Sequence, residues 1–142
     1  MSRKYFLCFW LGVILFFSAC VEAEYSPNQK FDYSSPKDVN AFNINLLQQN
    51  PVDDTIRFIV CGDTQRAYKE ADDFIKKVNS IANVDFVVIA GDLSEYGLLE
   101  EMKWVHKIYS KLYMPYIAVI GNHDMVANGI DVFKRMYGEL NY

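Results

Sequence analysis

Residues 86–92 have the sequence Phe-Val-Val-Ile-Ala-Gly-Asp, a short apolar run that ends in glycine followed by a carboxylate. Residues 56–63 have the same arrangement, and in residues 116–124 the glycine is followed by an amide, Asn122, in place of the carboxylate. The oxygen-bearing residues that follow the three glycines are 29 and 30 positions apart, and they are Asp63, Asp92 and Asn122. Runs of β-branched residues at this spacing indicate repeated strand–helix–strand units.

The segments between these runs have helical spacing of their apolar residues. We predict helices over residues 70–82, 98–112 and 130–137, and strands over residues 56–62, 86–90 and 116–120. This alternation predicts an α/β layered fold with parallel strands that are buried on both faces. Because the carboxyl ends of parallel strands lie along one edge of the sheet, the residues that follow the strands are expected to meet there.

The overall composition limits the architecture and the partners. The chain has 142 residues, of which 51% are hydrophobic, so it is long enough for one domain with a core. Its formal net charge is −4 and it has no basic stripe, which argues against a nucleic-acid partner.

The first 20 residues have the order of an export signal. A positive start at residues 2–4 precedes thirteen apolar residues, 5–17, which is short of the roughly 20 that span a bilayer. Ser18-Ala19-Cys20 then resembles the cleavage box of a bacterial lipoprotein, in which the cysteine carries the lipid. We therefore expect an exported, membrane-anchored chain. The alternatives are an ordinary signal peptide that leaves a periplasmic or extracellular protein, and an uncleaved anchor helix.

Residues 21–55 contain three prolines and few periodic apolar positions, so we predict a tether or N-terminal extension there. Residues 42–47 include apolar side chains that either pack on the sheet edge or form a short element, and the sequence does not decide between these. Cys61 lies in a predicted buried strand, where a free thiol usually behaves as a small hydrophobic group.

The motifs Gly62-Asp63-Thr64-Gln65, Gly91-Asp92 and Gly121-Asn122-His123-Asp124, in this order, resemble those of the calcineurin-like metallophosphoesterases. The resemblance covers about residues 56–137. It implies the N-terminal half of an αββα sandwich and hydrolysis of phosphoester bonds, in monoesters or diesters, at a dinuclear metal centre. The metals would be two divalent ions, of manganese, iron or zinc.

The same resemblance implies roles for individual residues. Asp63 would bind the first metal, Asp92 would bridge both metals, and Asn122 would bind the second. Gln65 stands where most members of the family have histidine, and its amide oxygen is a weaker ligand for transition metals. Glycine before each ligand lets the backbone turn sharply next to the ion.

His123 would face the scissile phosphoester, stabilise the transition state and protonate the leaving oxygen. Asp124 would orient His123 and favour its charged form, as a neighbouring carboxylate does. The other histidine, His106, lies in the middle of a predicted helix, and we interpret it as structural or solvated.

The family pattern continues with further histidine ligands that this sequence does not contain, since His106 and His123 are its only two histidines. We therefore expect that residues 56–142 form a partial domain, which needs a missing C-terminal half to complete both metal shells and to cover the edge of the sheet. The alternative is a non-catalytic lipoprotein remnant or binding module.

Overall fold

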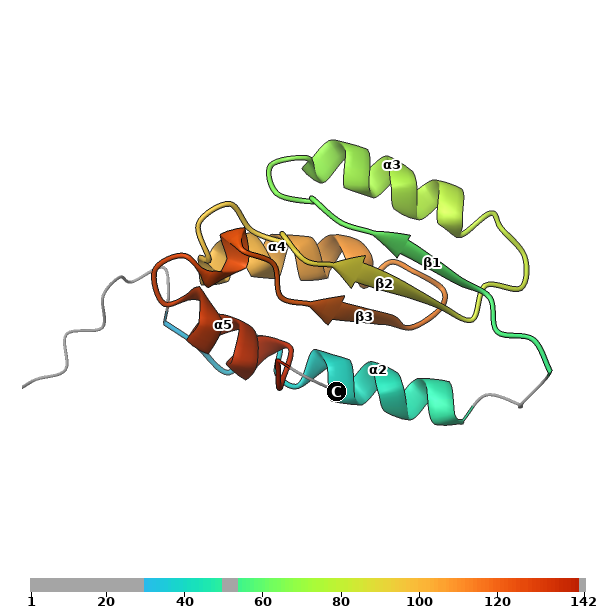
Figure 1. Ribbon diagram of the computed structural model, residues 1–142, viewed down its shortest axis with the longest axis horizontal. Helices are drawn as coiled ribbons and strands as arrows, with labels where there is room; N and C mark the ends of the chain where they lie inside the picture. The colour runs from blue at the N-terminus through green and yellow to red at the C-terminus, as the bar shows by residue number, and fades with distance from the viewer. Residues whose placement is uncertain (1–29, 50–53, 141–142) are drawn as a thin grey trace, which may run out of the picture.

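The computed structural model describes residues 30–49 and 54–140 (Figure 1). The predictions for the export signal and for Cys20 lie outside the described residues. Helices and strands alternate along the described chain in the following order: α2 (Val39–Gln48), β1 (Phe58–Cys61), α3 (Tyr68–Val78), β2 (Phe86–Ala90), α4 (Leu99–Tyr109), β3 (Tyr116–Val119), the 3-10 helix η2 (His123–Met125) and α5 (Gly129–Met136).

The three strands form one parallel sheet in the order β1-β2-β3. Each predicted strand and helix is present. Helices α3 and α4 end earlier than the apolar pattern indicated, because their last turns give way to turns and loops, and α5 is shifted by one residue. The predicted α/β layered fold with parallel strands is therefore confirmed.

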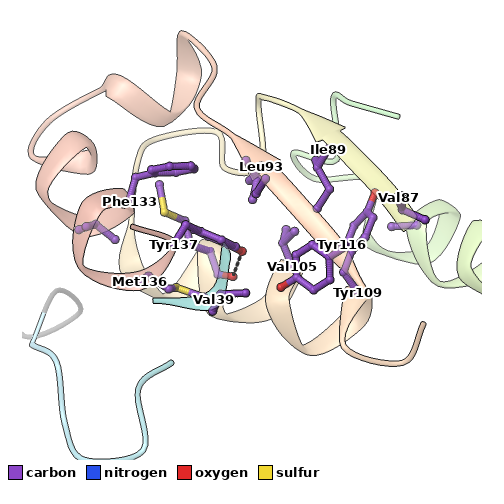
Figure 2. Packing of buried hydrophobic residues seen from close by; sticks show 14 of the residues in the cluster. Val39, Val87, Ile89, Leu93, Val105, Tyr109, Tyr116, Phe133, Met136 and Tyr137 are labelled. Carbon is purple, nitrogen blue, oxygen red and sulfur yellow. Dashed lines mark hydrogen bonds between the residues drawn. The ribbon is translucent and has the colours of Figure 1, made fainter. Parts of the chain in front are cut away.

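The hydrophobic core covers one face of the sheet. Val87 and Ile89 of β2, with Tyr116 and Ala118 of β3, are at most 3% exposed and point to this face. Helix α4 lies behind the sheet in Figure 1, and it contributes Val105 and other buried side chains to the core. Figure 2 shows that Phe133, Met136 and Tyr137, from α5 and the residue after it, extend the same core beyond the sheet.

The other face of the sheet is open, so the prediction of strands buried on both faces is wrong for the described residues. Phe58 and Val60 of β1 are 53% and 56% exposed, and Val119 of β3 is 45% exposed. No described helix or strand lies in front of this face in Figure 1. The physical reason is that right-handed crossovers place α3 and α4 on the same side of the sheet.

For residues 42–47 the sequence left open whether they pack on the sheet edge or form a short element. Both are observed, because these residues belong to helix α2, which packs along the edge strand β3. The side-chain amide of Asn40 donates to Ala118 O and accepts from Ala118 N, each at 2.8 Å. Asn40 thereby satisfies the outward backbone groups of β3 as a neighbouring strand would. Residues 39–48 thus belong to the folded unit, and the predicted tether over residues 21–55 does not include them.

Among the residues that the structure describes, no helix has the length and apolar character needed to cross a membrane.

Candidate functional site

The loops that follow the three strands carry the predicted site residues at the carboxyl edge of the sheet. Asp63 follows β1 with φ 52°, and Asp92 follows β2 with φ 54°. Left-handed backbone is uncommon for residues with a side chain, although aspartate tolerates it better than most. Such conformations tend to concentrate at functional positions.

Asp92 connects all three loops. Its carboxylate Oδ1 accepts a hydrogen bond from His123 N at 3.0 Å, and its backbone oxygen accepts one from Gln65 N at 3.2 Å. A Cβ atom on Gly121 would lie 2.2 Å from both Asp92 N and Asp92 Oδ1, so only glycine fits beneath this carboxylate. At Gly62, in contrast, an added Cβ would meet its neighbours at an ordinary 3.7 Å.

Gln65 has a buried side-chain oxygen without a partner. Its Oε1 is the buried side-chain atom in the described residues that makes no hydrogen bond. A buried polar oxygen without a partner is costly, and such an atom at a functional site often marks the position of an ion or water. This observation fits the prediction that Gln65 binds a metal through its amide oxygen.

Asp63 and Asn122 are less closely tied to the other site residues. Asp63 lines a cavity of about 190 Å3 against α3, together with Thr64, Glu70 and other residues, and this lining does not include Asp92, Asn122 or His123. Asn122 is exposed, and it precedes η2 without a side-chain hydrogen bond to that helix. The structure thus brings Gln65, Asp92 and His123 together, while Asp63 and Asn122 flank them.

The imidazole of His123 is held by the loop after β2. Its Nδ1 lies 3.3 Å from the backbone oxygen of Glu95. Because a carbonyl oxygen only accepts, this contact places the proton on Nδ1 and leaves Nε2 free. His123 is half-buried at this edge of the sheet.

Asp124 does not orient His123 as predicted. Its carboxylate is fully buried and accepts hydrogen bonds from Leu93 N (3.2 Å), Ser94 N (2.7 Å), the Ser94 hydroxyl (2.7 Å) and Gly121 N (3.0 Å). The turn of η2 directs the Asp124 side chain away from the neighbouring imidazole and into the loop after β2. Asp124 therefore ties the loops after β2 and β3 together, and it is a positioning residue.

Two residues at this edge were not predicted from the sequence. Glu95 is the backbone partner of His123, and its carboxylate Oε1 lies 3.7 Å from the guanidinium of Arg66. Arg66 has left-handed backbone, with φ 62°. Both Arg66 and Glu95 lie within a few residues of a motif, and this proximity could have indicated from the sequence that they belong to the same edge.

The described residues fit a hard cation better than a transition metal. No three His, Cys, Asp or Glu side chains in the described part of the chain are placed to hold one ion together. The available donors at Gln65, Asp92 and Asn122 are amide and carboxylate oxygens, which are ligands for hard divalent ions. The side-chain oxygen of Gln65 is a further donor without a partner among the described residues.

The two other titratable groups considered in the sequence have structural roles. Burial raises the pKa of the Cys61 thiol, which lies 3.4 Å from the hydroxyl of Tyr109, so it is not a reactive thiolate. His106 Nδ1 lies 2.6 Å from the hydroxyl of Tyr116 at the opposite end of the sheet. Burial lowers the pKa of His106, which confirms its structural interpretation.

The described residues form a layered α/β domain with carboxylate and amide oxygens and a histidine at the carboxyl edge of its sheet. The sequence model of the family described as calcineurin-like phosphoesterase matches residues 56–142, and the chain belongs to this family. Divalent metals are general in the family, and its members are hydrolases. No match was found among curated proteins.

Proposed function

We propose that this chain hydrolyses phosphoester bonds, in monoesters or diesters, at a centre of two divalent metal ions bound at the carboxyl edge of the sheet. The observation that carries the proposal is the contact between two motifs, in which Asp92 Oδ1 accepts from His123 N. The membership in the phosphoesterase family over residues 56–142 supports it.

In this proposal Asp92 would contribute to holding both ions, Asp63 and Gln65 would hold the first, and Asn122 would hold the second. The hydrogen bond from His123 N leaves lone pairs on both oxygens of Asp92 for ligation. The buried Oε1 of Gln65 has no hydrogen-bond partner among the described residues, and a bound ion would be its partner. Divalent ions bound in this way supply Lewis acidity and lower the pKa of a bound water.

His123 acts on the substrate directly. Glu95 O holds Nδ1 and fixes the ring, so that Nε2 faces the open edge of the site. When the ring is protonated, Nε2 donates to the oxygen that leaves phosphorus, and the neutral ring remains held through Nδ1. The protonated ring also stabilises the negative charge that develops in the transition state.

The charge balance indicates that further donors take part. Two divalent ions carry a charge of +4, whereas the carboxylates of Asp63 and Asp92 together carry −2. The other proposed ligands, Gln65 and Asn122, are neutral amides. We propose that ligands outside this set, from a C-terminal half of the domain, complete the shells. Without them each ion keeps mostly water, and we expect slow turnover.

The experiment combines metal analysis with kinetics on the wild type, Asp92→Asn and His123→Ala, using a nitrophenyl phosphomonoester and diester with manganese, iron and zinc. Asp92→Asn should lose metal because the bridge becomes neutral. His123→Ala should keep metal and lose turnover by about 10²–10⁴-fold, as for loss of a general acid. A metal-free wild type would favour the non-catalytic binding module, and loss of metal in His123→Ala would contradict the assigned roles.

We also propose that the chain is exported and anchored through a lipid on Cys20. The support is the charged start, the thirteen apolar residues and Ser18-Ala19 before the thiol. Mass spectrometry of the membrane fraction tests this proposal. An intact Met1, or cleavage elsewhere without lipid, would contradict it.

A further inference from the structure

Arg66 is the basic side chain of an otherwise acidic edge. The three loops after the strands, residues 62–67, 91–98 and 120–128, are described throughout, and Arg66 is their only lysine or arginine. The same loops carry four carboxylates, on Asp63, Asp92, Glu95 and Asp124. An anionic substrate that approaches this edge therefore meets one guanidinium among groups of its own charge.

The guanidinium of Arg66 is only loosely held. Its Nη1 lies 3.7 Å from Glu95 Oε1, which is longer than a hydrogen bond, and the Arg66 side chain is 75% exposed. Exposed pairs of this kind contribute little to stability. Arg66 is thus free to exchange Glu95 for a better anionic partner.

Glu95 places Arg66 beside His123. The backbone oxygen of Glu95 is the contact of His123 Nδ1, and its carboxylate is the partner of Arg66. One residue therefore touches both the imidazole assigned to the scissile bond and the guanidinium. The imidazole and the exposed guanidinium therefore have Glu95 as a common neighbour at this edge of the sheet.

The backbone of Arg66 is unfavourable for its own side chain. Its φ of 62° lies in the left-handed region, where glycine or asparagine is preferred and arginine is uncommon. Neither a buried contact nor a close ion pair of the side chain compensates for this conformation in the described structure. The hydrogen bond from Ala67 N to Thr64 O closes a turn in which Arg66 is the third residue, and this turn accounts for the left-handed backbone.

We propose that Arg66 is a substrate-binding residue, whose guanidinium pairs with the non-bridging oxygens of the phosphoryl group, and that Glu95 holds it at the mouth of the site until the substrate arrives. This inference rests on the proposed phosphoesterase function. The planar guanidinium matches two phosphate oxygens at once, which a lysine ammonium does not.

The experiment measures the affinity of inorganic phosphate for the full chain by amide NMR titration, with and without magnesium, and the metal content of the same samples. The variants are Arg66→Ala, Arg66→Lys, Arg66→Gly and Glu95→Gln. The matched control is Arg57→Ala, which removes an exposed arginine next to the start of β1, at the other end of that strand.

Arg66→Ala and Arg66→Gly should weaken phosphate binding by about tenfold or more, as for loss of a charge-assisted contact. Arg66→Lys should recover only part of this loss. Glu95→Gln should tighten binding about two- to threefold, because the competing carboxylate is neutralised. Arg57→Ala should leave the affinity unchanged, and none of the variants should change the metal content.

Arg66→Gly also separates binding from folding. Glycine relieves the left-handed backbone, so this variant should unfold at a higher temperature than Arg66→Ala while binding phosphate equally weakly. A wild type that binds neither metal nor phosphate would overturn the proposed function. A chain that binds metal, but whose phosphate affinity is absent or insensitive to Arg66, would overturn only the role of Arg66.

Discussion

The loops after β2 and β3 are locked to each other, whereas the loop after β1 is attached to them at its surface. The buried Asp124 carboxylate accepts from residues of both locked loops, and Gly121 lies directly beneath Asp92. The β1 loop is joined to them by the hydrogen bond from Gln65 N to Asp92 O and by the long ion pair of Arg66 with Glu95.

This difference indicates which part of the site is formed by folding alone. Asp92 and His123 are held by partly buried hydrogen bonds, so they are preorganised for binding and chemistry. Asp63, Gln65 and Arg66 belong to a loop that is anchored to α4 by the buried Thr64 hydroxyl, 3.0 Å from the Tyr109 hydroxyl. Toward the other two loops it makes only the hydrogen bond of Gln65 N and the ion pair of Arg66, and it has a buried oxygen without a partner among the described residues. We expect an ion or a phosphoryl group to complete the attachment of the β1 loop.

Among the variants that test the difference between the loops, removal of the Asp124 carboxylate should reduce the stability most. Asp124→Ala leaves the buried backbone N–H groups of Leu93 and Ser94 without their acceptor. We expect the free energy of unfolding to fall by about 3 kcal/mol or more, with loss of metal binding. Urea unfolding measures this, with Asp73→Ala as the control, because that exposed carboxylate pairs only with Lys76 and should cost less than about 1 kcal/mol. Similar losses in the two variants would show that the loops are not locked through Asp124.

The two motif glycines offer a matched pair for the next largest effect. In Gly121→Ala the new methyl group would collide with Asp92, so we expect a loss of about 1–3 kcal/mol and displacement of the carboxylate. In Gly62→Ala the methyl group meets only ordinary contacts, and the change in stability should stay within about 1 kcal/mol. Thermal unfolding and metal titration of both variants measure the contrast, and equal behaviour would contradict it.

A smaller effect on stability, which depends on pH, is expected from His106 at the end of the sheet opposite the three loops. Burial lowers the pKa of His106 in the folded state below its ordinary value of 6.5. As the pH falls below 6.5, the unfolded chain takes up a proton at this position before the folded chain does, so stability should decrease. His106→Gln should flatten the dependence of unfolding free energy on pH in this range. If the slope is unchanged in this variant, another group is responsible for it.

The local patterns in the sequence predicted the elements of the fold and half of the site. Apolar periodicity located the strands and helices, and the strand order brought Gln65, Asp92 and His123 to one edge. The role of Asp124 was not predictable, because its partners lie about 30 positions away and the turn of η2 decides which way it faces. The contact of Asn40 with Ala118, 78 positions apart, was hidden for the same reason.

The open face of the sheet was also not predictable from strand composition. Phe58 and Val60 are as apolar as the buried positions of β2, so the sequence of β1 does not distinguish a covered face from an uncovered one. The covered and uncovered faces of the sheet can be told apart only from the structure, in which α3 and α4 lie on one side and α2 lies at the edge.

The most direct test of the metal site is a titration of the isotope-labelled full chain with Mn2+, followed by paramagnetic broadening of its amide NMR signals. We predict that the signals of residues 63–65, 91–92 and 122–123 broaden first, and that Asp92→Asn abolishes this pattern. Broadening that is centred instead on the carboxylates of Asp72 and Asp73 in α3, and that persists in Asp92→Asn, would contradict a metal centre at the carboxyl edge of the sheet.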